Sequence, residues 1–561
     1  MALIRRELRA ASVMDERRTA EPWYERSKER YRWEVEQFRR RGLEPRISCP
    51  AERLQIDVSL EINGPSVPVS VVYPIDFPIV PPTVFGPPGI LKRHQEARFH
   101  NFCLLESDDD WDPRRDAASM VADTLRKLLE DDAVGPDAVA AHEADMPEPT
   151  SSQLPYATAQ VVVVPDPFWE PQLSTTCGGM TLMPIQASNI FMLIDAKGLE
   201  RADSQLVRRF NQRRNHEGGY WVSLKAAPPI GSAPVEVLAL ALNAEEQVRT
   251  ALAARSKDKR ADGWWIAVTF MEEGPTRDER RRAWVFIRVR LGHGTWKAEA
   301  IVRAQALTLA ERERRTPELV GLSACTLVVV GAGSLGAPIA VELVKAGAGS
   351  TIIVDTDIYD VNNPVRHLLP VTVAGTPKAT ALAEYCQSLN PFVRVEAQDL
   401  AIGRSAGIND VIRGASMVID TTGSTVVARV LYKYCTTHEV PLLVVGLTAG
   451  AYGADVALFR PGGACPVCLE LEQSDGRIPR PDKGPLSNVT PIGCSHPAFF
   501  GAGFDASEVA AVATRLAISA TGASAYPTAP FDWVVLNYRR EPRRIQGTLR
   551  AREDCWFHPH L

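Results

Sequence analysis

Three closely spaced glycines form the most informative candidate site in this sequence. An apolar run over 326–330 leads into Gly331, Gly333 and Gly336, and a helical pattern over 337–345 follows. This order predicts a buried strand, a tight turn and a helix, which together present backbone N–H groups and a helix N-terminus to a phosphate. By itself the pattern indicates a nucleotide and does not say which one.

Charged side chains further along decide between nucleotides. Asp355 follows a strand predicted at 350–354, where an acid reaches ribose hydroxyls, and this fits NAD and ATP alike. Making an acyl-adenylate from ATP also needs cations on the triphosphate and a carboxylate for Mg²⁺, because charge builds on the α-phosphate as pyrophosphate leaves. Arg366 and Lys378 could supply the cations, and Asp420 ends a predicted strand, where it could hold the metal ion. A Rossmann oxidoreductase would have no task for these three charges.

The order of these residues resembles the MoeB/ThiF and ubiquitin-activating family over about 316–460. The shared pattern is the glycine turn, the Asp-x-Asp of Asp355 and Asp357, the Asn-x-x-Arg that begins at Asn363, and then Lys378 and Asp420. The resemblance implies that these residues bind ATP and Mg²⁺ and adenylate the free C-terminal carboxylate of a protein substrate. It also implies a homodimer in which an arginine before the first strand, Arg314 or Arg315, reaches the partner's nucleotide.

Two cysteine-containing pairs predict a zinc site. Cys465 and Cys468 form a Cys-x-x-Cys, and Cys555 and His558 form a Cys-x-x-His near the C-terminal end of the sequence. Together they offer the four ligands of tetrahedral Zn²⁺. MoeB-type relatives use two Cys-x-x-Cys pairs, so the histidine departs from their pattern. The alternatives are unmetallated thiols, or His560 in the place of His558.

Cys494 is a candidate nucleophile. It lies on a loop punctuated by glycine and proline that leads into a helical pattern. The thiolate is the reactive form, and a helix N-terminus or a nearby cation favours it. In ubiquitin-activating enzymes a loop cysteine before such a helix accepts the acyl group as a thioester, and the resemblance implies that role here. The alternative is a core cysteine that packs as a small hydrophobe.

The N-terminal part of the chain carries a second candidate cysteine, Cys103. Around it the sequence predicts a helix at 22–43, extended runs at 54–62 and 67–73, and a proline-rich passage at 74–89. Trp111 and a second helix at 116–129 follow the cysteine. This order resembles ubiquitin-conjugating enzymes and implies that Cys103 accepts a thioester. The family's His-Pro-Asn is missing, so Asn101 or a backbone group would stabilise the oxyanion. The alternative is a buried structural thiol.

These patterns predict a multidomain α/β and α+β protein. Residues 1–130 form a ubiquitin-conjugating-like domain and 131–156, acidic and rich in Ala and Pro, form a linker. Residues 157–315 form a β-rich domain, in which 235–243 is one of several segments that are taken as extended. Residues 316–561 form a Rossmann-like adenylation domain with a mostly parallel sheet and helices on both faces.

The composition narrows the location and the partners. A length of 561 residues allows several domains, and a net charge of −5 gives no electrostatic reason to expect nucleic acid. The sequence shows neither a signal peptide nor an apolar run long enough to span a membrane. Ten cysteines, mostly isolated, suit a reducing cytoplasm.

A conjugating-like module ahead of an activating module resembles the bacterial fusion enzymes of type II cyclic-oligonucleotide anti-phage (CBASS) defence. The resemblance implies that a cGAS-like nucleotidyltransferase is adenylated at its C-terminus, carried as a thioester and passed to a lysine of a target protein. Two alternatives stay open. One is a ThiF-type sulfur-carrier adenylyltransferase, acting on a ubiquitin-like protein and using its N-terminal domain for docking. The other is a nucleotide-sensing scaffold.

Overall fold

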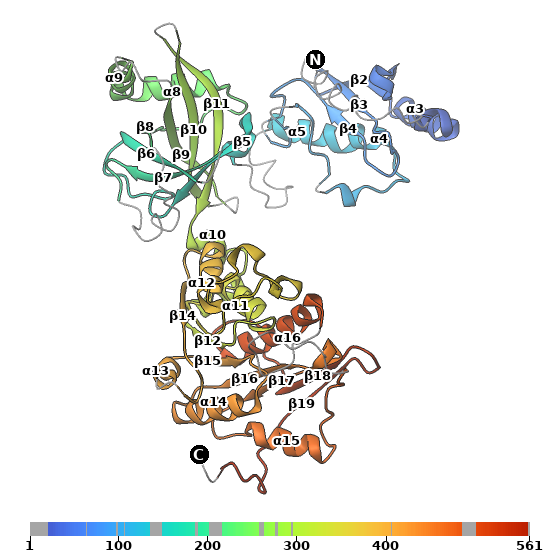
Figure 1. Cartoon of the computed structure of the whole chain (residues 1–561). Coiled ribbons are helices and arrows are strands. Elements are labelled where there is room, and N and C mark those ends of the chain that lie inside the picture. Colours follow the sequence, from blue (N-terminus) through green and yellow to red (C-terminus); the bar gives the residue numbers. More distant parts are fainter. Residues whose placement is uncertain are drawn as a thin grey trace. The chain divides into compact units, whose positions relative to one another are not determined.

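The computed structural model divides into two compact units, Met1–Leu307 and Thr308–Leu561 (Figure 1). It describes residues 21–62, 64–91, 93–96, 99–105, 107–134, 149–185, 189–200, 216–256, 263–274, 279–292, 295–404, 407–484 and 501–558. Within these ranges, every helix is too short or too polar to cross a membrane.

The first unit begins with two helices and a four-stranded antiparallel sheet. The helices are α2 (Trp23–Arg26) and α3 (Lys28–Arg40), and the strands, in sheet order, are β1 (Arg46–Ser48), β2 (Gln55–Glu61), β3 (Ser66–Val72) and β4 (Thr83–Phe85). The predicted helix at 22–43 is confirmed with one interruption, at Ser27, whose backbone leaves the helical region. A helical stretch follows the sheet as α4 (Ala117–Ser119), a π-helical turn (Met120–Leu125) and α5 (Arg126–Val134).

A buried carboxylate ties α3 to this sheet and to the helix that follows it. Glu34 is fully buried and accepts hydrogen bonds from the Tyr73 hydroxyl and from the Ala117 N–H, each at 3.0 Å. The Arg30 guanidinium lies 2.7 Å from the same carboxylate. Burial raises the pKa of Glu34, and its hydrogen bonds and Arg30 oppose that rise. No local sequence pattern predicts this network, because its members lie far apart in the chain.

The rest of the first unit is a closed barrel of seven strands. Its order is β10-β11-β5-β7-β6-β8-β9, with β5 parallel to β11 and to β7, and β8 parallel to β9. The strands are β5 (Tyr156–Pro165), β6 (Cys177–Ile185), β7 (Ile190–Ala196), β8 (Glu217–Ser223), β9 (Gly263–Glu273), β10 (Arg280–Gly292) and β11 (Thr295–Leu307). The predicted β-rich character of this region is confirmed.

One segment predicted as extended is a helix. Residues 235–243 belong to α8 (Pro234–Ala244), which is followed by α9 (Glu246–Arg255). Proline at the first helical position and a Glu236 carboxylate that accepts the Ala233 N–H at 2.7 Å begin the helix. Leucine and alanine, which fill most of it, are strong helix formers. The prediction of an extended segment at 235–243 is therefore wrong.

The second unit is built on an eight-stranded mixed sheet. Its order is β14-β13-β12-β15-β16-β17-β18-β19, parallel from β14 to β16 and antiparallel from β16 to β19. The strands are β12 (Thr326–Val330), β13 (Ser350–Val354), β14 (Arg394–Gln398), β15 (Met417–Asp420), β16 (Leu442–Leu447), β17 (Gly453–Phe459), β18 (Trp533–Asn537) and β19 (Arg544–Gly547). The mostly parallel sheet predicted from residue 316 onward is confirmed, since its first five strands are parallel and only the last three run antiparallel.

Helices cover both faces of this sheet, as the alternating pattern predicts (Figure 1). On one face lie α11 (Gly336–Lys345), α12 (Lys378–Leu389) and α16 (Gly503–Thr521), and on the other α13 (Ile408–Arg413), α14 (Thr425–Thr437) and α15 (Pro466–Ser474). Strand β12 buries Leu327 and Val329 toward the first group and Val328 and Val330 toward the second. Burial on both faces explains why its sequence is continuously apolar.

Candidate active site

The glycine-rich turn has the backbone geometry that only glycine tolerates. Gly331 has a φ of 96°, and a Cβ on Gly336 would lie 1.8 Å from the Gly331 carbonyl oxygen. A Cβ on Gly333, in contrast, would meet nothing within 4 Å, so this position faces open space. The predicted sequence of strand, turn and helix is confirmed. Its shape leaves room for a ligand to approach the backbone closely.

The strand register gathers the predicted acids at one edge of the sheet. Val330, the last residue of β12, is level with Val354 on β13 and with Asp420 on β15. Asp355 follows directly after Val354. The glycine turn, Asp355 and Asp420 therefore stand together at the carboxyl edge of three adjacent parallel strands, where open α/β sheets bind ligands.

Asp355 and Asp357 organise the loop beside the glycine turn. The Asp355 carboxylate accepts hydrogen bonds from the Ala332 N–H at 2.6 Å and the Asp357 N–H at 2.7 Å. Lys378 lies 2.8 Å from the Asp357 carboxylate through its ammonium, and its own N–H donates to the Asp357 carbonyl. Each Asp355 oxygen has a second lone pair, so the carboxylate can still accept a hydroxyl.

Asp420 is buried, and only one of its two carboxylate oxygens is hydrogen-bonded within the described residues. Its side chain is held by Thr422, whose N–H and hydroxyl donate to Oδ1 at 2.9 and 2.7 Å. The other oxygen, Oδ2, is buried and has no hydrogen-bond partner within the described residues. Burial raises the pKa of Asp420 to about 6 against the two Thr422 hydrogen bonds. Because an unsatisfied buried carboxylate oxygen is costly, this oxygen fits a hard cation such as Mg²⁺.

The loop that carries Arg366 is fastened to the glycine turn by a residue that was not predicted. Arg366 follows a short 3₁₀ turn (Asn363–Val365) and is half-buried, and this burial lowers its pKa. His367 is buried, and its Nε2 lies 2.7 Å from the Ala332 carbonyl oxygen. A histidine next to an arginine carries no spacing signal of its own, so the sequence could not identify it.

The start of α16 packs on the same arginine. A Cβ on Gly503 would lie 3.4 Å from the Arg366 Cα, in van der Waals contact, so the helix begins directly against this residue. Cys494 precedes this helix but lies outside the described residues, as do His496 and His560. The described chain stops at Gly484 and resumes at Gly501. The role of Cys494 therefore stays a prediction.

Arg314 and Arg315 lie just after α10 (Leu309–Glu313). Both are exposed, and both pair with Glu311 of that helix, at 3.1 Å for Arg314 and 3.4 Å for Arg315. Their pairing with Glu311 does not distinguish which of them would reach a second subunit. The expectation of such an arginine remains a prediction.

The four predicted zinc ligands converge. The atoms that Cys465, Cys468, Cys555 and His558 offer all lie within 4.8 Å of one another. The Cys465 sulfur is 3.7 Å from that of Cys468 and 3.5 Å from that of Cys555, and the Cys468 sulfur is 3.5 Å from the His558 Nε2. In tetrahedral Zn²⁺ coordination two sulfurs are separated by about 3.8 Å and a sulfur and an imidazole nitrogen by about 3.5 Å. The spacing fits a closed structural zinc site.

Cys103 is exposed, so the alternative of a buried structural thiol is wrong. Its backbone is nevertheless fixed, because its N–H donates to the His94 carbonyl at 2.8 Å and the neighbouring Phe102 N–H donates to Val84 on β4 at 2.8 Å. Trp111, predicted to follow the cysteine loop, is buried and donates its indole N–H to the Pro78 carbonyl at 2.7 Å. The exposed thiol therefore stands on a well-supported loop.

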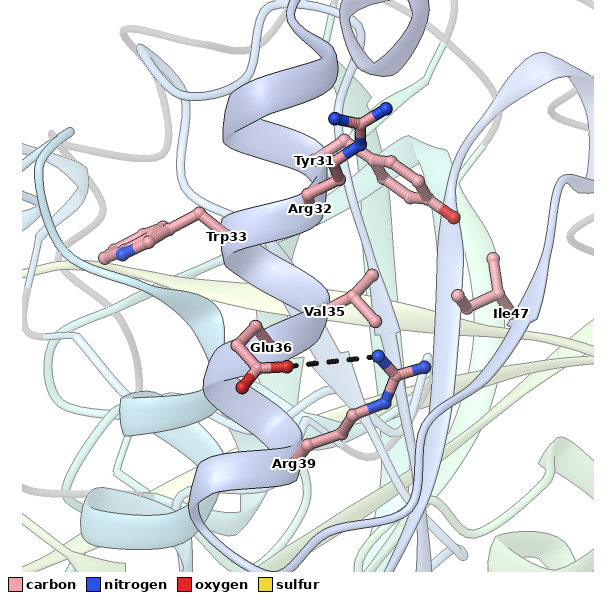
Figure 2. A pocket seen from close by; sticks show the side chains of 7 residues that line it. All are labelled: Tyr31, Arg32, Trp33, Val35, Glu36, Arg39 and Ile47. Carbon is pink, nitrogen blue, oxygen red and sulfur yellow. Dashed lines mark ion pairs between the residues drawn. The ribbon is translucent and has the colours of Figure 1, made fainter.

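A surface hollow of the N-terminal part lies elsewhere, between α3 and β1. Figure 2 shows its lining, including the ion pair between Glu36 and Arg39 at 3.9 Å. Its volume is about 530 Å³, and it is lined by Tyr31, Arg32, Trp33, Val35, Glu36, Arg39 and Ile47. None of the residues predicted to act in catalysis lies in this lining.

Comparison with known proteins places the second unit in a family. Residues 309–521 match the ThiF family, and this stretch is therefore a ThiF-family domain, as the sequence predicted. Over most of its length the chain is similar to the uncharacterised protein y4oA of Sinorhizobium fredii, at 26% identity over 87% of this chain and 88% of y4oA.

Two further relatives match about a third of the chain. The SAMP-activating enzyme E1 of Haloferax volcanii is 32% identical over 30% of this chain and 63% of its own. The ATP-dependent ubiquitin transferase-like protein Cap2 of Enterobacter hormaechei is 28% identical over 34% of this chain and 32% of its own. The chain thus spans less than two thirds of either relative. A crystal structure of Escherichia coli MccB with ATP aligns at 17% identity, covering 43% of this chain and 69% of MccB, with a TM-score of 0.34.

Proposed function

We propose that the second unit uses ATP to activate the C-terminal carboxylate of a protein. The observation that carries this proposal is the buried, unpartnered Oδ2 of Asp420, level with the glycine turn at the carboxyl edge of the sheet. A Rossmann turn that served only NAD would gain nothing from an unsatisfied carboxylate at this point. The ThiF family match and the similarity to enzymes named as activators and adenylyltransferases support the same reaction.

In the proposed reaction a carboxylate oxygen of the protein substrate attacks the α-phosphorus of ATP. The new bond gives an acyl-adenylate, the bond to the β-phosphate oxygen breaks, and pyrophosphate leaves. The Gly331 N–H already donates to the Val354 carbonyl, so the Gly333 N–H of the turn would hold a phosphate oxygen. Arg366 and Lys378 offset the charge that develops on the phosphates. Asp420 would hold Mg²⁺, which shields the phosphate charge when bound. Asp355 would accept the ribose hydroxyls.

We further propose that two thioesters follow. The Cys494 thiolate attacks the acyl carbon and AMP leaves, and the Cys103 thiolate then displaces Cys494 from the same carbon. A lysine amine of the target finally displaces Cys103 and leaves an amide. Support for the second step is the exposure of Cys103 on a rigid loop. Tethering the two cysteines in one chain would raise the effective concentration of one at the other.

The proposed partners are a cGAS-like nucleotidyltransferase, in a CBASS-type anti-phage setting, or a ubiquitin-like protein. We also propose a homodimer in the cytoplasm, with Arg315 or Arg314 reaching the partner's nucleotide, and a structural Zn²⁺ bound by the Cys/His cluster. The similarity to Cap2, named as an ATP-dependent ubiquitin transferase-like protein, supports a ubiquitin-transferase-like reaction. The first unit, with its antiparallel sheet and its exposed cysteine, would be the conjugating-like module.

Pyrophosphate exchange tests the proposed activity. Purified full-length protein is mixed with ATP, Mg²⁺ and labelled pyrophosphate, together with either a cGAS-like nucleotidyltransferase or a ubiquitin-like protein from the same genome. Label should enter ATP only when the substrate has a free C-terminal carboxylate, and the matched control is the same substrate with that carboxylate amidated. Exchange that is absent with every such substrate, or equal with the amidated one, would contradict the proposal.

A second candidate is a sulfur-carrier adenylyltransferase that stops at the adenylate. It is favoured by one observation, a 38% identity over 102 residues to the sulfur carrier protein adenylyltransferase of Thermus thermophilus. Under this reading the first unit would only dock the carrier. A non-reducing gel separates the two, because a reducible adduct that disappears in Cys103→Ala argues for the relay. A nucleotide-sensing scaffold, the remaining alternative, would show no exchange at all.

A further inference from the structure

His367 joins the loop of Arg366 to the glycine turn through both of its ring nitrogens. Nε2 lies 2.7 Å from the Ala332 carbonyl oxygen, inside the turn, and Nδ1 lies 3.2 Å from the Leu369 backbone nitrogen. The ring also packs edge-on against Tyr359 at 5.0 Å between centroids. Arg366 is the preceding residue, so the imidazole fixes the distance between this arginine and the turn.

The hydrogen bonds determine which nitrogen carries the proton. The Leu369 N–H can only donate, so Nδ1 must accept and must be unprotonated. Nε2 then carries the hydrogen and donates to the Ala332 carbonyl. Only this neutral tautomer satisfies both contacts. A doubly protonated ring would place an N–H at Nδ1 against the Leu369 N–H and lose one of the two.

We propose that His367 is a positioning residue for the nucleotide reaction, which holds Arg366 at its working distance from the phosphate-binding turn. This inference rests on the proposed adenylation function and adds to it a residue that does not itself touch the nucleotide. A loop arginine stabilises the developing negative charge most strongly when the fold already holds it at the right distance, because no rearrangement is then needed during the reaction.

The charges around the ring favour its neutral form. Burial is the main cause that lowers the pKa of His367, and the nearby cations Lys378 and Arg366 lower it further. The Ala332 hydrogen bond and Asp355 act in the opposite direction. Because the folded-state pKa lies below its ordinary value, the contact is intact at neutral pH and is lost as the pH falls through that pKa.

Two variants divide the contacts of the imidazole between them. In His367→Gln the amide nitrogen is as many bonds from Cβ as Nε2 is, so the donor to Ala332 is kept. In His367→Asn the amide reaches only as far as Nδ1, so that donor is lost while an acceptor for Leu369 remains. The two changes are similar in polarity, and each is the matched control of the other.

The experiment is Mg-ATP binding to the full-length chain by calorimetry at pH 7.5, with thermal unfolding recorded for every variant. His367→Asn should weaken binding by about tenfold, the usual cost of a lost buried hydrogen bond, and His367→Gln by no more than about threefold. The same pair is then made in an Arg366→Ala background, where the difference between Asn and Gln should shrink to about twofold or less, because the group being positioned is gone.

Each outcome has a distinct meaning. If the wild type fails to bind Mg-ATP, the proposed function is wrong and takes this inference with it. If the wild type binds and Asn equals Gln, only the role of His367 is wrong. If the difference between Asn and Gln persists undiminished without Arg366, the histidine serves the turn alone and the link to Arg366 is overturned.

Discussion

Asp420 and Val330 are register partners on adjacent parallel strands, β15 and β12. The strand that ends in the glycine turn and the strand that ends in the buried acid therefore finish side by side. Thr421 strengthens this junction, because its hydroxyl lies 3.0 Å from both the Val330 and the Gly331 carbonyl oxygens. The backbone of the sheet therefore fixes the position from which the proposed metal-binding carboxylate projects.

The first prediction separates function from stability at this acid. Asp420→Asn should reduce pyrophosphate exchange by about a hundredfold or more, because it removes the charge that would hold Mg²⁺. The same change should stabilise the second unit by about 2–3 kcal/mol at neutral pH, since it relieves a buried carboxylate whose pKa is raised to about 6. Exchange assays and thermal unfolding measure the two effects. A variant that is both inactive and less stable would contradict this account.

The second prediction concerns pH. An acid whose folded-state pKa of about 6 exceeds its ordinary value of 3.8 binds its proton more tightly when folded. Its contribution to the free energy of unfolding therefore falls as the pH rises through the window between these values and is constant above it. The difference in unfolding temperature between wild type and Asp420→Asn should grow from pH 4 to about pH 6.5 and then level off. A difference that is the same across this range would show that Asp420 is not perturbed.

The third prediction concerns the Cys/His cluster. Purified protein should contain about one zinc ion per chain, and Cys555→Ser should lose most of it and unfold at a lower temperature. The matched control is His558→Cys, which restores a four-sulfur set and should keep the metal. Elemental analysis and thermal unfolding check both. If the wild type contains no zinc and Cys555→Ser is as stable as the wild type, the cluster is a set of packed thiols without a metal ion.

The fourth prediction concerns the buried network of the first unit. Glu34→Ala should destabilise this part of the chain by about 3 kcal/mol, because it removes the ion pair with Arg30 and leaves the Tyr73 hydroxyl and the Ala117 N–H without their acceptor. Tyr73→Phe removes one hydrogen bond and should cost about 1 kcal/mol. Urea unfolding followed by tryptophan fluorescence measures both changes in the full-length protein. Pyrophosphate exchange should be unchanged in each, which guards against a global effect.

The fifth prediction assigns separate stages to separate cysteines. Cys103→Ser should leave pyrophosphate exchange intact and should replace the reducible adduct at this position by an adduct that resists thiols, since serine forms an oxygen ester. Cys494→Ala should also retain exchange but should form no adduct at Cys103. Non-reducing gels with ATP and the substrate protein check this order. Loss of exchange in Cys103→Ser would mean that the two stages are not separable.

Local patterns predicted much of this molecule, and contacts between distant residues account for what they missed. The glycine turn, the strand-end Asp420 and the two metal-ligand pairs were recognisable because each is defined within a few residues of sequence. The partners of Glu34 and His367 were not, since Ala117 and Ala332 lie 83 and 35 positions away and only the fold brings them together. Segment 235–243 failed for another reason. A short apolar run fits helix and strand alike until its capping residues are considered.

The convergence of Cys555 and His558 on α15 has a practical consequence for anyone who purifies this protein. A polyhistidine handle fused next to His558 would add several imidazoles close to the ligands of the cluster. Such imidazoles would compete for the same ion, and a nickel column could load the wrong metal. An affinity tag is better placed far from Cys555 and His558 in the sequence.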